Sequence, residues 1–318
     1  MRILIVGKCD YSNIVESTAS AFRDCSYPSV VFDTNKYRRV DKYIKRDYSR
    51  NKLYYNLWNW NPSFVFLIAP LFIDPEYVDI IDHYKKKQGC RIAGWVGDVF
   101  DETHDRIRNL RVCDKIYVTD SHLLGHLPDS DSAYLPLATD TSIFHKTMES
   151  KRYEFSFVAS MTANRLDLLK DVDLHVDLWG PGWKKVKKEI GKSTVHGDSR
   201  SIHQAARIYN RSRAVLNVKN AKNVVAGLNQ RSFDPCACGC LLFHDQVRDL
   251  ERHFDPGTDL IVYRDTEELE YFYRKYSKDR REAGRISEAG WKKVVNHHTF
   301  HHRVEHILRD FDIGRSPS

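Results

Sequence analysis

Residues 229–245 read Asn229-Gln-Arg-Ser-Phe-Asp-Pro-Cys-Ala-Cys-Gly-Cys-Leu-Leu-Phe-His-Asp245, a polar opening followed by small residues, a short apolar run and an acid. The spacing predicts a helix that places Arg231 and Asp234 one turn apart, so that both side chains can face one ligand. The run Leu241-Leu242-Phe243 is typical of a buried strand. Loop, helix and strand together predict half of a nucleotide-binding α/β unit.

The chemistry of Arg231 and Asp234 suits a ligand that carries both phosphate and hydroxyl groups. The arginine fork matches phosphate oxygens, and a carboxylate in a first helical turn can accept from two vicinal ribose hydroxyls. A second interpretation stays open, in which the two side chains pair with each other on a solvated helix face and contribute only about 0.2–0.5 kcal/mol.

Composition sets the class of protein. The 318 residues are enough for two domains of roughly 150 residues each. With 42% hydrophobic and 29% charged residues, a globular chain is expected rather than a disordered one. The sequence has no apolar run near about 18 residues and opens directly into a short strand, so we expect a cytoplasmic protein without a signal peptide. The seven scattered cysteines favour reduced thiols, and the net charge of +7 permits an anionic ligand.

The N-terminal half begins as a βαβ unit. Residues 2–6 predict a central parallel strand, residues 18–23 a helix and residues 29–32 a second strand. No Gly-x-Gly-x-x-Gly fingerprint follows the first strand, which disfavours a nicotinamide or flavin enzyme of the usual type.

Asp98 follows a further predicted strand at residues 91–96. Ligands of doubly wound sheets gather at the carboxyl ends of the strands, so Asp98 is a candidate catalytic residue. Capping of the following helix is the alternative role for this side chain.

A basic, aromatic segment lies between residues 36 and 60. Its basic residues are Lys36, Arg38, Arg39, Lys42, Lys45, Arg46, Arg50 and Lys52. Tyrosines and tryptophans accompany them at positions 37, 43, 48, 54, 55, 58 and 60. The segment is interpreted either as a solvated helix face or as an approach for an anionic acceptor, which could be nucleic acid.

The second half repeats the layout of the first. A strand over residues 153–160 leads into a loop and a helix, where Arg165 in the first turn could meet an anion together with free backbone amides. The elements predicted after it are a strand at 174–179 that ends in Gly180-Pro-Gly182, a turn at 195–199, strands at 214–218 and 260–263, and a helical stretch over 279–311.

The domain boundary is predicted near the crossing at residues 140–148. We expect an N-terminal Rossmann-like domain at residues 1–148 and a C-terminal one at residues 149–299. A C-terminal helix at about 300–318 is expected to pack back on the first domain.

Two clusters resemble metal sites but favour other roles. Cys236, Cys238 and Cys240 alternate where a helix is expected, so their side chains diverge and core packing is the better interpretation. The histidines between residues 297 and 306 are interpreted as side chains of a solvated helix end. The sequence therefore predicts no metal site.

Several motifs of the second half resemble a known family. They are Ala159-Ser160, Asn164-Arg165, Tyr209-Asn-Arg-Ser-Arg213, Asn229-Gln-Arg-Ser-Phe-Asp-Pro-Cys-Ala-Cys-Gly239 and the closing His298-Thr-Phe-His-His-Arg303. Their types and order are similar to the CgeB-like group of GT-B glycosyltransferases, named for a spore maturation protein, over most of residues 90–306. The resemblance implies two Rossmann-like domains whose parallel sheets face each other across a cleft that holds the active site.

The same order of motifs is similar to the phage DNA β-glucosyltransferase, another GT-B enzyme. That resemblance aligns Trp95-Val-Gly-Asp98 with a strand ending in an aspartate that deprotonates the acceptor, and Arg165 and Arg231 with phosphate-binding arginines. It implies that the turn around Ser199 holds the base edge through backbone groups. Asp234 stands where both relatives carry a glutamate, so its contact with the ribose is expected to shift or to need a bridging water.

The resemblance implies a set of donor-binding residues. They are Ser160, Asn164, Arg165, Gly180, Ser199, Asn229, Arg231 and Asp234.

We therefore expect a hexosyltransferase that moves a sugar from a nucleotide-sugar, most simply a UDP-sugar, to an acceptor hydroxyl. Asp98 would serve as general base and give inversion, without a metal ion or a cofactor other than the donor. If Asp98 is instead remote from the donor sugar, a retaining reaction is expected. The acceptor could be a surface polysaccharide, a lipid-linked or small-molecule hydroxyl, or a hydroxymethylated base in DNA. A non-catalytic sugar-nucleotide sensor is the alternative from another class, and the protein is expected to be a monomer or a homodimer.

Overall fold

The computed structural model describes residues 1–44, 47–100, 105–127, 131–199 and 201–312. The chain divides into a first unit, Met1–Pro136 with Phe300–Ser318, and a second unit, Leu137–Thr299. Residues 137–148, which the sequence assigned to the first domain, belong to the second unit. Lys146, for example, pairs with Glu288 at 2.5 Å.

Within the described residues the first unit contains a six-stranded sheet in the order β2-β1-β3-β4-β5-β6, with every neighbouring pair parallel. The strands are β1 (Ile3–Gly7), β2 (Ser29–Asp33), β3 (Phe64–Ile68), β4 (Arg91–Val96), β5 (Lys115–Val118) and β6 (Asp131–Tyr134). All residues of β1 and β3 are buried, as expected for central strands covered on both faces.

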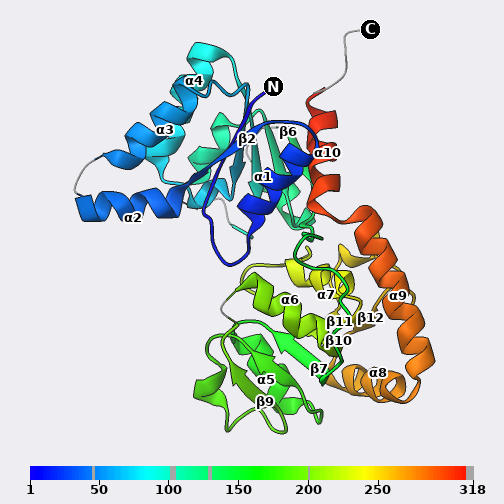
Figure 1. The fold of residues 1–318 in the computed structure, drawn as a ribbon. Coiled ribbons are helices and arrows are strands. Elements are labelled where there is room, and N and C mark those ends of the chain that lie inside the picture. Colours follow the sequence, from blue (N-terminus) through cyan, green and yellow to red (C-terminus); the bar gives the residue numbers. More distant parts are fainter. Residues whose placement is uncertain (45–46, 101–104, 128–130, 200, 313–318) are drawn as a thin grey trace. The chain divides into compact units, whose positions relative to one another are not determined.

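Helices cover both faces of the first sheet (Figure 1). They are α1 (Ile14–Asp24), α2 (Thr34–Ile44), α3 (Tyr48–Trp58), α4 (Pro75–Gln88) and α10 (Phe300–Asp310), with short 3-10 segments at Pro70–Phe72, Ile107–Val112 and Ser121–Gly125. Local sequence sets their limits: α4 begins where the Asp74 carboxylate accepts from the Glu76 amide and ends at Gly89, whose φ is 69°.

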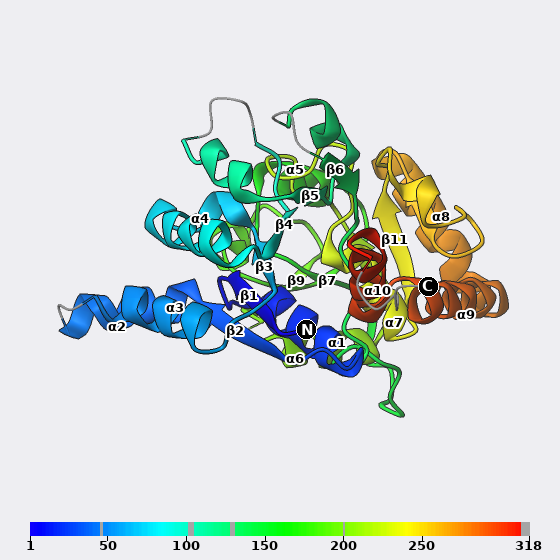
Figure 2. The same ribbon diagram turned by 90° about the horizontal axis from the view of Figure 1, so that it is seen from above.

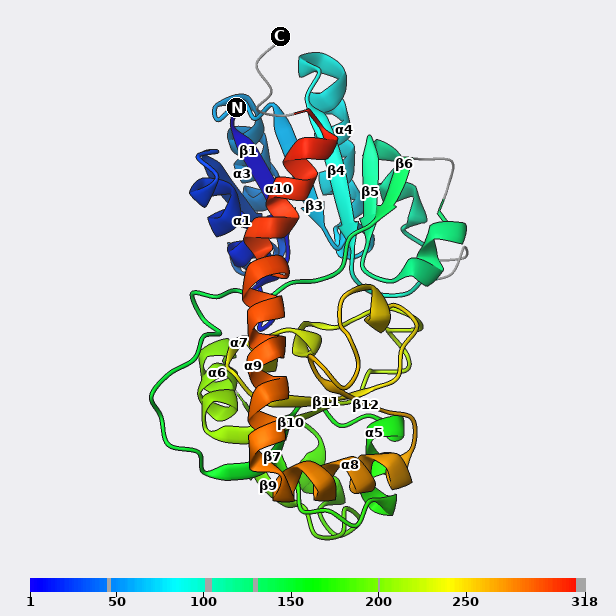
Figure 3. The ribbon, with the colours of Figure 1, turned by 90° about the vertical axis from the view of Figure 1, so that its right-hand side faces the viewer.

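Helix α10 belongs to the first unit although it closes the sequence. It lies beside α1, as Figure 3 shows. The Tyr117 hydroxyl donates to Asp310 at 2.9 Å, and the rings of Phe64 and Phe311 meet edge to face at 5.0 Å. The last residues of the predicted C-terminal helix, 313–318, lie outside the described part of the chain.

The second unit has, in its described residues, a parallel sheet in the order β12-β11-β10-β7-β8-β9. The strands are β7 (Tyr153–Val158), β8 (Asp177–Trp179), β9 (Thr194–Gly197), β10 (Ser212–Asn217), β11 (Leu241–Asp245) and β12 (Ile261–Tyr263). Counted from the first strand of this unit, the order is that of the doubly wound nucleotide-binding fold.

The second sheet lies between two hydrophobic clusters, one on each face. Its helices are α5 (Ala163–Asp171), α6 (Ile202–Asn210), α7 (Asp234–Ala237), α8 (Thr266–Lys278) and α9 (Arg280–His297), with 3-10 segments at Trp183–Val186, Gln230–Ser232 and Leu250–Arg252. The two parallel sheets and their covering helices confirm the predicted α/β class.

Two local predictions were wrong. Residues 194–197 form strand β9 rather than a turn, because this short edge segment pairs with β8. The helical stretch at the C-terminus is interrupted at His298 and Thr299, where His298 is buried against Phe233 and Thr299 forms a β-bridge with Thr139. None of the described helices is long and apolar enough to cross a membrane.

Candidate functional site

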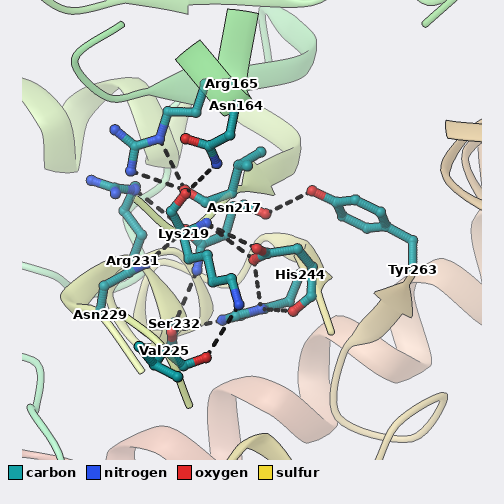
Figure 4. Close-up of polar contacts among 12 residues, drawn as sticks. Asn164, Arg165, Asn217, Lys219, Val225, Asn229, Arg231, Ser232, His244 and Tyr263 are labelled. Atoms are coloured by element: carbon teal, nitrogen blue, oxygen red, sulfur yellow. Dashed lines mark hydrogen bonds and ion pairs between the residues drawn. The ribbon is translucent and has the colours of Figure 1, made fainter. Parts of the chain in front are cut away.

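The strand order of the second sheet identifies where a ligand would bind. The order reverses between β7 and β10, and ligands of such sheets bind outside the carboxyl ends of the strands at this switch point. Ser160, Asn164 and Arg165 follow β7, and Lys219 follows β10. The switch point therefore brings together side chains from two distant parts of the sequence (Figure 4).

Arg165 is almost fully buried, at 4% exposure. Its Nε and Nη2 donate to the Val218 carbonyl at 3.0 and 2.9 Å, and Nη1 donates to the Ser160 carbonyl at 2.9 Å. Burial, followed by the positive charge of Arg231, lowers the pKa of Arg165 to about 9, so the guanidinium is still charged at neutral pH. Arg165 thus joins the ends of β7 and β10 and contributes a positive charge from beneath the site.

Asn164 reinforces the same connection from the first turn of α5. Its Nδ2 donates to the Lys219 carbonyl at 2.9 Å, and its Oδ1 accepts from the Thr162 hydroxyl at 2.9 Å. Asn164 and Arg165 therefore hold the loop after β10 against the start of α5. All three nitrogens of the Arg165 side chain, and the Asn164 amide nitrogen, donate to backbone carbonyls.

Arg231 lies beside Arg165 and is more open to solvent (Figure 4). Its Nε donates to Asn217 Oδ1 at 3.3 Å, and no ion pair joins it to a carboxylate among the residues described. An arginine has five N–H donors in a planar fork. Most of the Arg231 fork can therefore meet a ligand, and a second guanidinium close by favours an anionic one.

Asn217, at the end of β10, is fully buried and orients this arginine. The same Oδ1 also accepts from Asn229 Nδ2 at 3.2 Å, and Asn217 Nδ2 donates to the Ser232 hydroxyl at 3.4 Å. One buried amide therefore fixes three side chains of the segment 229–232.

The network continues to the end of β11. The Asp245 carbonyl accepts from His244 Nδ1 at 2.6 Å, so the other ring nitrogen, Nε2, accepts from the Ser232 hydroxyl at 2.8 Å. The Asp245 carboxylate accepts from the Lys219 amide at 3.0 and 3.2 Å. The carboxyl ends of β10 and β11 are thus linked through fixed polar groups.

Asn229 contains an unsatisfied buried atom. Its Oδ1 has no hydrogen-bond partner in the described structure, although its Nδ2 is bonded to Asn217. Buried acceptors of this kind are uncommon and cost free energy unless a ligand or water satisfies them. The unsatisfied oxygen supports the prediction that Asn229 belongs to a binding site. It does not identify the ligand group that Asn229 would contact.

Asp234 lies in the interior of the second unit, at 5% exposure. Its Oδ1 accepts from the Thr139 hydroxyl at 2.8 Å. Burial raises the pKa of the Asp234 carboxyl well above its ordinary value. A ribose hydroxyl would therefore have to reach a carboxyl group that is buried and already bonded to Thr139 through one oxygen.

Gly180 is fixed by a close approach of two loops. Its φ is 133°, and a Cβ at this position would lie 2.1 Å from the Ala159 carbonyl oxygen. Its amide donates to the Gly197 carbonyl at 2.8 Å. Only glycine therefore lets the loop after β8 lie against the end of β7. Ser199 follows β9 and is partly buried; its hydroxyl donates to the Ser201 carbonyl at 3.4 Å.

Asp98 lies in the first unit, two residues after β4, and is partly buried. This position agrees with the expectation that it follows a central parallel strand, and its chemical role stays a prediction. Cys236, Cys238 and Cys240 are buried in the hydrophobic core, which confirms their predicted packing role. No group of three or more His, Cys, Asp and Glu side chains among the described residues is arranged to hold a metal ion.

The members of the network that were not predicted include Asn217, Lys219 and His244. Asn217 ends β10, His244 is the last residue but one of β11, and Lys219 follows β10 by two residues. The rule that singled out Asp98, a polar residue at the carboxyl end of a buried strand, would have found all three.

Comparisons with known proteins agree with this geometry. Residues 161–309 match a family model described as "Glycosyl transferase-like". A sucrose-phosphate synthase from Thermosynechococcus elongatus has a TM-score of 0.69 at 10% identity, with 98% of each chain covered. Anabaena HepE in complex with UDP and glucose has a TM-score of 0.67 at 8% identity, covering 98% of this chain and 99% of that one. An α-glucosyltransferase in complex with UDP has a TM-score of 0.65 at 11% identity, covering 98% of this chain and 100% of that one.

The chain has the GT-B fold. The similarity extends over both units, while the family match covers most of the second unit and α10. No curated protein sequence matches this GT-B protein. The finer resemblances, to the CgeB-like group and to the phage enzyme, stay predictions.

Proposed function

We propose that the protein transfers a sugar from a nucleotide-sugar, with a UDP-sugar as the expected donor, to an acceptor hydroxyl. The observation that carries the proposal is the Arg231 guanidinium, oriented by buried Asn217 next to Arg165 at the switch point of the second sheet. The glycosyltransferase-like family match and the UDP held by two of the similar structures support it.

In this proposal Arg231 binds the diphosphate directly, and the buried charge of Arg165 strengthens the binding from below. The negative charge on the diphosphate grows as the sugar leaves, so two fixed guanidinium groups stabilise the transition state more than the ground state. This chemistry needs no metal ion or further cofactor. Asn164 and Lys219 keep the two loops in place around the diphosphate.

Ser160, Gly180 and Ser199 would line the rest of the donor site, and Asp234 would accept from the ribose after the Thr139 hydroxyl has moved. The Asn229 carbonyl oxygen, which has no partner within the described chain, would accept from a donor hydroxyl.

A donor screen tests the proposal. Melting temperatures are measured with UDP-, GDP-, CMP- and dTDP-sugars, and a donor present at 100 times its Kd should add about 2.7 kcal/mol to the unfolding free energy. Arg231→Ala should weaken binding of that donor roughly 10- to 150-fold, the equivalent of a charge-assisted hydrogen bond. The matched control is Arg213→Ala, an exposed arginine of the same unit that pairs with Glu154 at 2.9 Å. Failure of every nucleotide-sugar to stabilise the protein would overturn the proposal.

Asp98 is proposed as the general base that takes the proton of the acceptor hydroxyl, giving inversion at the anomeric carbon. Asp98→Asn should abolish transfer while leaving donor affinity nearly unchanged. Asp82→Asn is the control, because Asp82 lies on α4 of the same unit and pairs only with Lys86 among described residues. Transfer by Asp98→Asn at the parental rate would exclude Asp98 as the base.

The acceptor class, the hexosyl specificity and the cytoplasmic location expected from the sequence stay predictions. Donor hydrolysis without an acceptor would argue against a non-catalytic sensor.

A further inference from the structure

The positive charge of the chain is concentrated in one helical hairpin. Residues 34–58, the range that includes α2 and α3, contain eight basic and two acidic residues, whereas the whole chain has a net charge of +7. Most of the net charge therefore lies in this segment, and the remainder of the protein is close to neutral. Lys45 and Arg46 lie outside the described residues, so the surface described below does not include them.

The two helices extend from the first sheet beside β2 (Figures 1 and 2). Asp41 of α2 accepts hydrogen bonds from both the amide and the hydroxyl of Ser49 in α3, which fixes one helix against the other. Tyr37 stacks on the buried Phe32 ring at 5.0 Å and anchors α2 to the unit. The hairpin therefore presents a defined surface.

The cations of α2 share the face opposite its anchor. At 3.6 residues per turn, positions 36, 38, 39 and 42 fall within about 160° of the helix circumference, away from position 37. All four side chains, Lys36, Arg38, Arg39 and Lys42, are exposed, and none forms a salt bridge with a described residue. The Lys36 ammonium lies 6.0 Å from the centre of the Tyr37 ring. Their charges are thus available to an anionic partner.

Exposed aromatic side chains accompany these cations on the two helices. Tyr43 is 84% exposed, and Tyr48, Tyr54, Tyr55 and Trp58 of α3 are exposed as well. Large aromatic side chains are usually buried, because each removes a large apolar area from water. Five exposed rings on the two helices that carry these cations therefore indicate a contact surface. We name it the α2–α3 face: the four cations of α2, with Tyr43 and the four rings of α3.

Contacts among the rings discriminate between two anionic partners. Tyr54 and Trp58 lie against each other at 5.0 Å, and the Lys52 ammonium lies 4.8 Å from the centre of the Tyr55 ring. Tyr48 contacts Tyr37 at 6.0 Å. Single-stranded nucleic acids bind by stacking bases on open ring faces, and the four exposed rings of α3 already have neighbours.

The composition of the α2–α3 face fits a lipid surface better. Tyrosine and tryptophan combine an apolar ring with a polar tip, and together with lysine and arginine they favour the headgroup layer of a bilayer. Clusters of four to eight basic side chains on a helix are typical of binding to anionic lipids. We propose that the α2–α3 face binds the anionic surface of a lipid bilayer, with its cations on lipid phosphates and its rings among the headgroups.

Vesicle binding of the full chain tests this proposal. Cosedimentation is measured with vesicles of phosphatidylcholine alone and with equal parts of phosphatidylcholine and phosphatidylglycerol, at low and high salt. The parent should bind the anionic vesicles and not the neutral ones. Replacing Arg38, Arg39 and Lys42 by glutamine should weaken this binding roughly 100-fold, from the contribution of each basic side chain near an anionic surface.

The matched control removes three exposed lysines from the second unit, Lys185, Lys187 and Lys188, by the same substitution. It makes the same change in net charge and should keep vesicle binding. The double variant of Tyr43→Ser and Tyr55→Ser should weaken binding at high salt, where the ring contribution dominates.

Three outcomes would overturn the proposal: equal binding to neutral and anionic vesicles, control and α2 variants that lose binding to the same degree, or tighter binding to an oligonucleotide than to anionic vesicles. The last would assign the face to nucleic acid. Melting temperatures show that each variant is folded, and because the assay contains no donor, its result is independent of the proposed transfer reaction.

Discussion

Asn217→Leu separates the role of the buried network from that of the arginine it holds. The substitution keeps the approximate volume of the side chain and removes three hydrogen bonds, at 3.2 Å to Asn229, 3.3 Å to Arg231 and 3.4 Å to Ser232. These bonds are long, so each contributes at the lower end of about 0.5–1.5 kcal/mol, while buried donors left without a partner cost about 1–3 kcal/mol.

We expect the unfolding free energy to fall by about 2–4 kcal/mol, which lowers the melting temperature by roughly 5–15 °C. Donor affinity should fall for a different reason. Without Asn217, the Arg231 side chain must be immobilised by the ligand, at about 0.5–1.5 kcal/mol. UDP should then bind roughly 2- to 12-fold more weakly, a smaller loss than for Arg231→Ala.

Titration calorimetry with UDP, performed well below the melting temperature of each variant, measures this loss. The control is Asn210→Leu, because Asn210 is also buried in the second unit and makes three hydrogen bonds, at 2.8, 2.9 and 3.1 Å. It should lose at least as much stability and keep the parental Kd for UDP. An Asn217→Leu protein that melts earlier and binds UDP as tightly as the parent would refute the positioning role.

Two further predictions concern stability. Gly180→Ala should lower the unfolding free energy by roughly 3 kcal/mol or more, because its Cβ would lie 2.1 Å from the Ala159 carbonyl oxygen at a φ of 133°. Gly284→Ala, in an open helical position, should instead raise the unfolding free energy by about 0.5–1 kcal/mol. Equal melting temperatures for the two variants would contradict this prediction. The pKa of Asp234 is raised from its ordinary 3.8 by burial, so the folded state holds this proton more tightly and the unfolding free energy falls as pH rises above 3.8 towards the folded-state pKa. The Asp234→Asn variant should therefore have a higher melting temperature than the parent at neutral pH, and this difference should disappear near pH 3.8 and below. A difference in melting temperature that does not depend on pH would contradict the raised pKa of Asp234.

The sequence predicted those elements whose own residues show a clear hydrophobic pattern. Short apolar runs predicted most strands of both sheets, and residues that follow those strands, such as Asn164 and Arg165, do lie at the switch point. Strand β9 was missed because an edge strand of four residues has only one fully buried position. Strand β9 is defined by its pairing with β8, because its own sequence has no clear strand pattern.

The environment of individual side chains could not be predicted from local spacing. Arg231 and Asp234 are close in sequence, yet one is partly exposed and the other is buried beneath Thr139, which lies 95 positions away. Arg165 was predicted as a direct phosphate ligand, and the carbonyls of Ser160 and Val218 take three of its donors. Such partners become known only once the strands are assembled.

The most direct test is the distance from the Arg231 guanidinium to the nearest diphosphate oxygen in a crystal structure of the protein with UDP. We predict about 2.7–3.2 Å, with the diphosphate outside the carboxyl ends of β7 and β10. UDP bound with its diphosphate beyond the reach of Arg231 would contradict the account.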